Sequence, residues 1–300
     1  MGSSSGRGSG TVIRRAENDA DLAGWCDVWT AITPREPASL DKVKRRLERQ
    51  PERLYLVAEV AGRIVGAGFA GPSQSRERTG LAVRVLPEQR RRGLGSALLD
   101  RLLSHARGLG PDRVSGMVDE DDTQSVAWVQ RRGFAEYDRQ IELSRQIQAV
   151  EEAGSPPPGI EIAELGEEHL EGAYAVAVEC FPDMPVTPAI PAPPYEEWLE
   201  EEVPGPVTFV ALDQARVVGY AALLDRVDSL AEHGLTAVLR SHRGRGIATA
   251  LKRAQLRWAA EHGYRELATW TQEGNAAMQA VNLKLGYRPR PAVINVWRRL

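Results

Sequence analysis

Two short stretches of the chain combine arginine and glycine directly before a segment with helical periodicity. Residues 90–95 read RRRGLG, and residues 243–248 read RGRGIA. The first turn of a helix exposes backbone N–H groups without internal partners, and the helix dipole adds partial positive charge there. Glycine lets a ligand approach the main chain, and arginine supplies charge-assisted hydrogen bonds. Each stretch is therefore a candidate pyrophosphate site. For either stretch alone, the alternative is an ordinary turn with solvated arginines.

Two other kinds of phosphate site fit these stretches less well. A Walker A loop ends in Gly-Lys-Ser/Thr, which neither stretch contains. A dinucleotide-binding fold has its glycine turn after the first strand, whereas each turn here follows the fourth predicted strand of its half.

The two stretches belong to an internal repeat. Residues 90–95 correspond to 243–248 at an offset of 153 residues, and residues 56–70 align with 209–223 at the same offset. A register of this length indicates two copies of one domain, each with its own core. Three consecutive prolines predict an extended linker between the copies. We therefore expect a disordered leader or tag over 1–10, an N-terminal domain over 11–147, the linker over 148–159 and a C-terminal domain over 160–300.

The second copy shows the expected elements most clearly. Its periodicity predicts a strand, two helices, three strands, a helix, a strand, a helix and closing strands. Gly263 is expected to stop the helix that follows the glycine turn, and Asn275 is placed to cap the next helix. Residues 181–194 contain too many prolines for regular structure and predict a loop. Each domain is therefore predicted to be α/β, a mixed sheet with helices on both faces.

The composition excludes several classes of protein. The 300 residues carry a formal net charge of −3, which gives no support to nucleic-acid binding. No apolar run is long enough to span a bilayer, and no signal peptide is visible. The two cysteines, Cys26 and Cys180, form neither a disulfide framework nor a metal site, so we expect buried thiols, no metal and a cytoplasmic location.

The paired motifs resemble those of the GNAT superfamily of acyl-CoA-dependent N-acyltransferases. The family signature is Gln/Arg-x-x-Gly-x-Gly/Ala between the fourth strand and the third helix, as in residues 90–95 and 243–248. A second signature ends in a Gly-aromatic pair, as in residues 122–134 and 275–287. The resemblance covers nearly all of both halves. Together they are similar to actinobacterial tandem GNAT proteins of the mycothiol-synthase kind, which implies two tandem GNAT-type domains.

The resemblance implies acetyl-CoA or coenzyme A as the cofactor. In the family, loop amides bind the pyrophosphate, and the pantetheine arm runs along the fourth strand, which splays from the fifth. The implied binding residues of the second copy are Leu239, Arg243, Gly244, Arg245, Gly246, Ile247, Ala248, Thr249 and Asn275. Those of the first copy are Val85, Leu86, Arg90, Arg91, Arg92, Gly93, Leu94, Gly95 and Ser96.

The candidate catalytic residues lie in the second copy. Family members often carry a tyrosine four residues before the Gly-aromatic pair, as the acid for the leaving thiolate. Here the first copy has Val129 and the second has Asn282, which can only hydrogen-bond the sulfur. The acceptor amine needs a general base, and Glu232 and His233, at the start of the fourth strand, are the candidates. We therefore expect the second domain to be the catalyst, and the first to bind coenzyme A structurally or to have lost activity.

The expected function is transfer of an acyl group, with acetyl the expected one, from acyl-CoA to a small-molecule amine. Two alternatives stay open. One is a non-catalytic acyl-CoA-binding or scaffold protein, and the other is an acyl-CoA decarboxylase or hydrolase on the same fold. Neither nucleic acid nor membrane is an expected partner, and a monomer is plausible because two domains in one chain can pack on each other.

Overall fold

The computed structural model describes residues 10–73, 77–152, 154–185, 189–201, 203, 205–227 and 229–300. The leader or tag expected over 1–10 therefore lies outside the described residues, apart from Gly10. The chain divides into two compact units, here called unit 1 and unit 2. Unit 1 consists of Met1–Met117, Trp128–Ala135 and Asn295–Leu300, and unit 2 consists of Val118–Ala127 and Glu136–Ile294.

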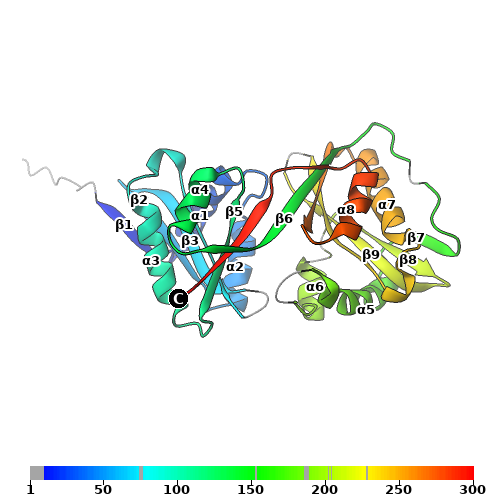
Figure 1. The fold of residues 1–300 in the computed structure, drawn as a ribbon, viewed down its shortest axis with the longest axis horizontal. Coiled ribbons are helices and arrows are strands. Elements are labelled where there is room, and N and C mark those ends of the chain that lie inside the picture. The colour runs from blue at the N-terminus through cyan, green and yellow to red at the C-terminus, as the bar shows by residue number, and fades with distance from the viewer. Residues whose placement is uncertain are drawn as a thin grey trace, which may run out of the picture. The chain divides into compact units, whose positions relative to one another are not determined.

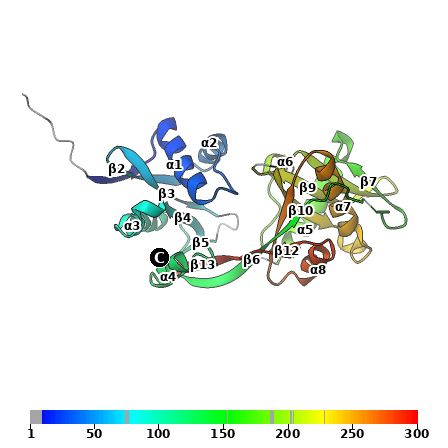
Figure 2. The same ribbon diagram turned by 90° about the horizontal axis from the view of Figure 1, so that it is seen from above.

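Unit 1 is built on strands that run antiparallel until the last pair. The register joins β1 to β2, β2 to β3 and β3 to β4 in antiparallel fashion, whereas β4 and β5 are parallel. Helices α1 and α2 cover one face of this sheet and α3 covers the other (Figure 2). The elements are β1 (Thr11–Arg15), α1 (Asp19–Ile32), α2 (Leu40–Arg49), β2 (Leu54–Val60), β3 (Arg63–Pro72), β4 (Thr79–Val85), α3 (Leu94–Ala106), β5 (Arg113–Asp119) and α4 (Thr123–Gln130).

Unit 2 repeats this plan. Strands β7 to β10 are antiparallel neighbours, and β10 and β11 are parallel. Helices α5 and α6 lie on one face, and α7 and α8 lie on the other (Figure 1). The mixed α/β fold expected from the sequence is confirmed. The elements are β7 (Ile160–Glu164), α5 (Leu170–Cys180), α6 (Tyr195–Glu201), β8 (Val207–Asp213), β9 (Arg216–Asp225), β10 (Leu230–Val238), α7 (Ile247–Glu261), β11 (Glu266–Gln272), α8 (Ala276–Lys284) and β12 (Arg288–Pro289).

The internal repeat extends to irregular details of the backbone. The β2–β3 pairing shifts register after Ala58, and the β8–β9 pairing shifts after Ala211, which is the same position at the offset of 153 residues. Such a shift marks a β-bulge, in which one strand carries an extra residue. The two copies therefore share this bulge as well as their motifs, whereas the β9–β10 pairing has a further register shift that the β3–β4 pairing lacks.

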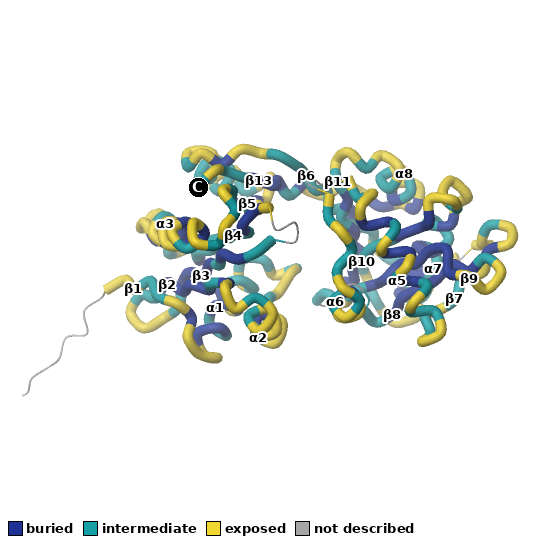
Figure 3. The backbone as a smooth tube through the Cα atoms, turned by 90° about the horizontal axis from the view of Figure 1, so that it is seen from below, coloured by how far each residue is buried: buried dark blue, intermediate teal, exposed yellow. Residues whose placement is uncertain are grey.

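Each unit has its own hydrophobic core, formed by the strands and the helices packed on them. Strands β2 and β3 and strands β8 and β9 are the longest buried stretches (Figure 3). Trp198, Tyr220 and Leu223 are among the fully buried side chains of unit 2, and Trp25 and Val57 anchor unit 1. Both cysteines are free and buried, as the sequence predicts.

Neither unit is one continuous stretch of chain. Strand β6 (Ala135–Gln146), from the end of the first sequence copy, pairs with β11 and β12 inside unit 2. Strand β13 (Val293–Arg299), from the end of the second copy, contributes Asn295–Leu300 to unit 1. The boundaries expected at 148–159 remain a prediction, because they describe the repeat and not this exchange of closing strands.

The exchange can be tested at Val296, which is 5% exposed on β13. We expect Val296→Asp to destabilise unit 1, because an unpaired buried charge is costly. Hydrogen exchange should speed up at the amides of β5, and those of β8 and β9 should keep their protection. The control is Arg299→Ala, a substitution at an exposed position of the same strand. Faster exchange in β8 and β9 alone would mean that β13 supports its own half of the sequence.

Candidate functional site

The parallel strands in the middle of each sheet separate soon after they meet. In unit 2, β10 and β11 pair only from Leu230 with Glu266 to His233 with Thr269, although both strands run further. In unit 1, β4 and β5 pair at only two positions. The β9–β10 pairing also shifts register between His233 and Thr236, and a bulge there bends β10. Both units therefore have the splay expected for a pantetheine arm, with backbone groups beyond the last paired residues.

The glycine loops lie where the sequence predicts them. Gly93 and Gly246 precede α3 and α7 with φ of 83° and 86°, and neither helix has a side-chain cap. A Cβ added at Gly93 or Gly244 would meet no atom within 4 Å. Open space, left-handed backbone and uncapped N–H groups together form a cradle for an anion. These features fit the pyrophosphate of coenzyme A in both units.

The first arginine of each motif has a structural role that the sequence does not reveal. Arg90 Nε donates to the carbonyl of Val85 at 3.1 Å, and Arg243 Nε donates to the carbonyl of Val238 at 3.0 Å. Each side chain therefore folds back onto the last residue of the preceding strand. These equivalent contacts fix the loop to its strand, whatever further contacts the guanidinium makes with a ligand.

The two loops differ in their electrostatics. In unit 2, Asp183 pairs with Arg240 at 2.6 Å and with Arg243 at 2.8 Å, and Asp213 lies 3.4 Å from Arg245. The hydrogen bond from Arg240 lowers the pKa of Asp183 to about 2. In the part of unit 1 that the structure describes, no carboxylate pairs with Arg91 or Arg92. The loop of unit 1 therefore presents more uncompensated positive charge to an anion.

The proline linker also touches the loop of unit 2. Pro157 Cγ lies 3.8 Å from the position that a Cβ would take at Gly246, and Arg245 donates to the carbonyl of Pro158 at 3.4 Å. At Gly93, no atom of the described residues lies within 4 Å of the corresponding Cβ position. Approach to the helix end is thus open in unit 1 and bordered by the linker in unit 2.

The two candidate bases, adjacent on β10, point to opposite faces of the sheet, as neighbours on a strand do. Glu232 is 9% exposed, accepts a hydrogen bond from Arg226 at 2.8 Å and another from Trp270 Nε1 at 3.2 Å. His233 is 3% exposed and uses both ring nitrogens, with Gln255 Oε1 at 2.7 Å and with the hydroxyl of Tyr287. Burial, together with Lys252, holds the pKa of His233 well below its ordinary value. His233 is therefore neutral and engaged inside the unit.

The helix α8 supplies the remaining two expected residues. Asn275 caps α8 by accepting from the N–H of Met278 at 3.2 Å, as the sequence predicts. Asn282 is fully buried, and neither its Oδ1 nor its Nδ2 has a hydrogen-bond partner. Thr271 Oγ1, on β11 beyond the last paired residue, is buried without a partner as well. Unpartnered polar atoms beside the splay suit the amide and thioester groups of a bound acyl-CoA.

A buried lysine escaped the sequence reasoning. Lys252 of α7 is 1% exposed, and it donates a hydrogen bond to Thr269 Oγ1 at 3.4 Å. Burial lowers its pKa to about 7. Gln255, Thr269 and Tyr287 are buried beside it. The internal repeat indicates that Lys252 is buried, because the residue at the corresponding position of the first copy is the apolar Leu99.

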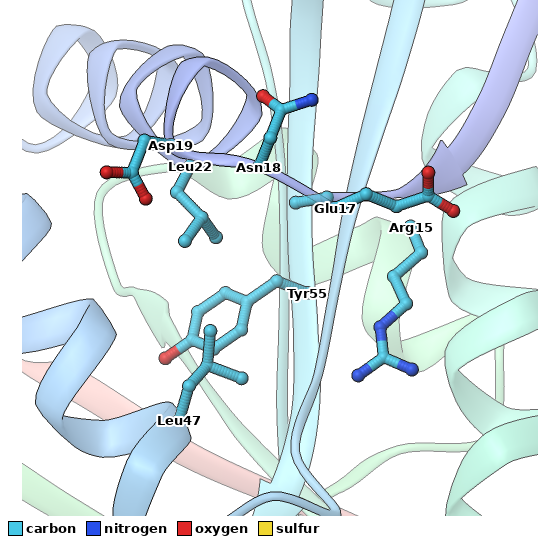
Figure 4. A pocket seen from close by; sticks show the side chains of 8 residues that line it. Arg15, Glu17, Asn18, Asp19, Leu22, Leu47 and Tyr55 are labelled. Atoms are coloured by element: carbon cyan, nitrogen blue, oxygen red, sulfur yellow. The ribbon is translucent and has the colours of Figure 1, made fainter.

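A pocket elsewhere in unit 1 does not contain any of the expected site residues. Leu22, Leu47 and Tyr55 line it, with Arg15 and Glu17 at its edge (Figure 4). Tyr55 lies at the start of β2, which runs parallel to β4 because each is antiparallel to β3. The glycine loop follows the far end of β4, so the pocket lies at the opposite end of the sheet from the anion cradle.

No group of three or more His, Cys, Asp or Glu side chains in the described ranges is arranged to hold a metal ion. None of the helices described has the length and apolar character of a membrane span.

The acetyltransferase (GNAT) family matches residues 16–134 and 170–287, which is most of the chain. The chain is a tandem GNAT acetyltransferase. This GNAT protein is 26% identical over 291 residues to the mycothiol acetyltransferase of Catenulispora acidiphila, covering 93% of this chain and 84% of that protein. It is 28% identical over 138 residues to an acetyltransferase of Sodalis glossinidius, covering 45% of this chain and 93% of that protein.

Solved structures share the fold of this tandem GNAT protein over its whole length. A tandem GNAT protein from the clavulanic acid biosynthesis pathway gives a TM-score of 0.75 at 20% identity, covering 97% of this chain and 98% of that one. A GCN5-related N-acetyltransferase from Sphaerobacter thermophilus gives 0.73 at 17% identity, covering 96% and 95%. The expectation of two GNAT domains in tandem is thereby confirmed, and acetyl-CoA is the substrate that the family implies.

The loop of unit 1 carries a strained residue that unit 2 avoids. Arg91 has φ of 65°, and the corresponding Gly244 has φ of 75°. We expect Arg91→Gly to raise the stability of unit 1 by about 0.5–1 kcal/mol, because left-handed backbone costs a side chain more than glycine loses in entropy. Affinity for coenzyme A should fall with the lost charge. Thermal melting and calorimetric titration measure the two effects. The reciprocal Gly244→Arg should destabilise unit 2, and a stabilised Gly244→Arg protein would contradict the strain.

The buried amine of Lys252 predicts a pH-dependent stability. Its pKa is about 7 in the folded protein against an ordinary 10.5, so the unfolded chain binds more protons between these values and stability rises with pH there. Lys252→Met should therefore raise the free energy of unfolding of unit 2 most at pH 7 and below. The difference in unfolding free energy between the variant and the wild-type protein should shrink by up to about 1.4 kcal/mol per pH unit above that. Urea unfolding of both proteins at about pH 7 and about pH 9 measures this. An advantage independent of pH would show that Lys252 is not buried as a titrating group.

Proposed function

We propose that this GNAT protein transfers the acetyl group of acetyl-CoA to a small-molecule amine, that unit 2 catalyses the transfer, and that unit 1 binds acyl-CoA without turnover. One observation carries the assignment to unit 2. Glu232 pairs with Leu224 and Ala268 at the start of the splayed strand of unit 2, and the residue of unit 1 with the equivalent pairing is Gly80. Where unit 2 has Asn282, unit 1 has Val129. A splay with no carboxylate and no polar partner for the thioester has little to offer an acyl transfer.

The chemistry follows from the face that Glu232 occupies. The amine nitrogen attacks the thioester carbonyl, a C–N bond forms, and the C–S bond breaks. The nitrogen loses one proton, which Glu232 takes directly or through a water molecule. The hydrogen bonds from Arg226 and Trp270 hold the carboxylate in place. We retain Glu232 rather than His233 as the proposed base, because both nitrogens of His233 are engaged on the other face.

The open loop of unit 1 supports a binding role for that unit. Arg91 and Arg92 are exposed beside the uncapped end of α3, and Gly93 leaves room for a phosphate. A relative named mycothiol acetyltransferase aligns along nearly the whole chain, which supports a small-molecule acceptor for the tandem protein. A non-catalytic scaffold remains the competing function, favoured by the carboxylates and the linker at the loop of unit 2.

Matched glycine variants test which unit is active. Gly93 and Gly246 have nearly the same φ, so glutamate brings similar strain to each and also repels a pyrophosphate. We expect Gly246→Glu to slow acetyl transfer by about a hundredfold or more, as misplaced substrates do, and Gly93→Glu to slow it much less. Thiol release in the presence of an amine panel measures the rate, and calorimetry should show one coenzyme A site lost in each variant.

Three outcomes would overturn the proposal. A greater loss of rate in Gly93→Glu would make unit 1 the catalyst. Binding of coenzyme A without thiol release for any amine would leave the protein a scaffold, and thiol release without an amine would make it a hydrolase.

A further inference from the structure

Unit 2 contains a polar cluster in a place where unit 1 is apolar. At the offset of 153 residues, Lys252 replaces Leu99, Gln255 replaces Leu102, and Tyr287 replaces Phe134. All six of these side chains are at most 5% exposed. The cluster is completed by His233, Thr269, Thr271 and Asn282. Their counterparts in the first copy are Leu81, which pairs with Ala70 as His233 pairs with Leu223, and Gly116, Val118 and Val129.

The apolar version shows that the fold does not require this cluster. Burying polar groups costs free energy unless every group is hydrogen-bonded, and a buried charge costs more. Here Gln255 Nε2, Thr271 Oγ1 and both polar atoms of Asn282 lack partners. Packing therefore does not explain why unit 2 carries these residues, whereas a role in its chemistry would.

The cluster lies at the point where the two central strands part. His233 and Thr269 are the last paired residues of β10 and β11. Lys252 Nζ lies 3.4 Å from Thr269 Oγ1 and 5.8 Å from the centre of the Tyr287 ring. The residues of the cluster lie on β10, β11, α7 and α8, except for Tyr287, which lies just after α8. An arm inserted between the separating strands would thus end beside these side chains.

Within the cluster, Lys252 is the group able to release a proton. The ring of His233 donates from Nδ1 to Gln255 Oε1 and accepts from the Tyr287 hydroxyl at Nε2, which satisfies a neutral imidazole. Burial raises the pKa of Tyr287, so its phenol is a poor acid. Asn282 has no ionisable proton. No carboxylate in the described part of the chain pairs with Lys252 to hold its charge.

We propose that Lys252 is the general acid of unit 2 and gives its ammonium proton to the departing thiolate, in the place of the tyrosine that neither half of this protein has. The proposal rests on the proposed function, because it requires catalysis in unit 2. Asn282 is then a positioning residue that hydrogen-bonds the thioester sulfur or carbonyl.

The step balances without any further reactant. As the C–N bond forms and the C–S bond breaks, the electron pair of the C–S bond passes to sulfur, and the Lys252 ammonium proton joins it to give the free thiol. The acceptor nitrogen loses one proton to Glu232 and from there to solvent, and neutral Lys252 regains one from solvent before the next turnover. An aliphatic thiol has a pKa of about 8.5, and burial brings the pKa of Lys252 to about 7, so the transfer is downhill.

Among the described residues, burial alone accounts for the lowered pKa of Lys252, with no contribution from a neighbouring charge. From β10 it faces neutral His233, from β11 it faces Thr269, and from the segment after α8 it faces Tyr287. Arg145 and Glu151 act on Tyr287 and not on Lys252. The rate of the acid-dependent step should therefore fall as pH rises past about 7, following the ammonium form of Lys252.

The test compares two acetyl donors that differ in their need for an acid. Acetyl-CoA releases an aliphatic thiolate, whereas phenyl thioacetate releases an aryl thiolate that leaves without a proton. We expect Lys252→Met to slow transfer from acetyl-CoA by about 10²- to 10⁴-fold, as loss of a general acid does. The loss with phenyl thioacetate and the same amine should be at least about tenfold smaller. Gln255→Leu, which copies unit 1 at a neighbouring position, is the structural control and should affect both donors alike.

The outcomes separate this proposal from the one before it. If Lys252→Met loses the same factor with both donors, Lys252 only supports the structure and the proposal is overturned. If Lys252→Met keeps full activity with acetyl-CoA while Gly246→Glu is inactive, unit 2 is the catalyst and the acid lies elsewhere. If both variants are fully active, the assignment of catalysis to unit 2 fails. Circular dichroism and melting of Lys252→Met confirm that the variant is folded.

Discussion

The structure of each unit depends on how few hydrogen bonds join its two parallel strands. The antiparallel strands of each sheet pair along most of their length, which gives the sheet its rigidity. The parallel pair β10–β11 is held over four positions, and β4–β5 over two. A strand that leaves its partner exposes N–H and C=O groups, which must find other partners. A ligand with amides of its own can supply such partners. The glycine loop, the uncapped helix and the polar cluster are all arranged around this gap.

The two units therefore share a fold but differ in the charges around the gap and the glycine loop. Unit 1 has an apolar interior beside its gap and exposed arginines at its loop, which favours retention of an anion. Unit 2 has carboxylates facing its loop arginines and a lysine inside, which weakens the attraction for phosphate and places a titratable proton near the gap. The two copies keep the same order of elements, while their side chains and the bulge in β10 differ. The differences between matched positions are thus more informative about role than the shared motifs are.

Much of this organisation could be predicted from the sequence because the determinants are local. The glycine turns, the Asn275 cap and the order of elements all follow from residue types at short spacing. The fold-back of Arg90 and Arg243 could not be predicted, since it depends on a carbonyl five residues away in a turn of particular shape. Lys252 was missed because it sits in a helix among good helix formers, where nothing local marks it as buried. The opposite orientations of Glu232 and His233 follow from strand periodicity, but which face carries the site depends on the whole sheet.

The exchanged closing strands make the order of synthesis matter. The residues of β13 that complete unit 1 are translated after the segment Glu136–Ile294 of unit 2, because they follow it in the chain. Unit 1 therefore lacks β13 until nearly all of the second copy has been translated. Unit 2 in turn needs β6, which is translated before β7 and the rest of the second copy. If the gene were divided between the two copies, the first product would lack β13 and the second would lack β6. Each unit can therefore be completed only when both copies are present.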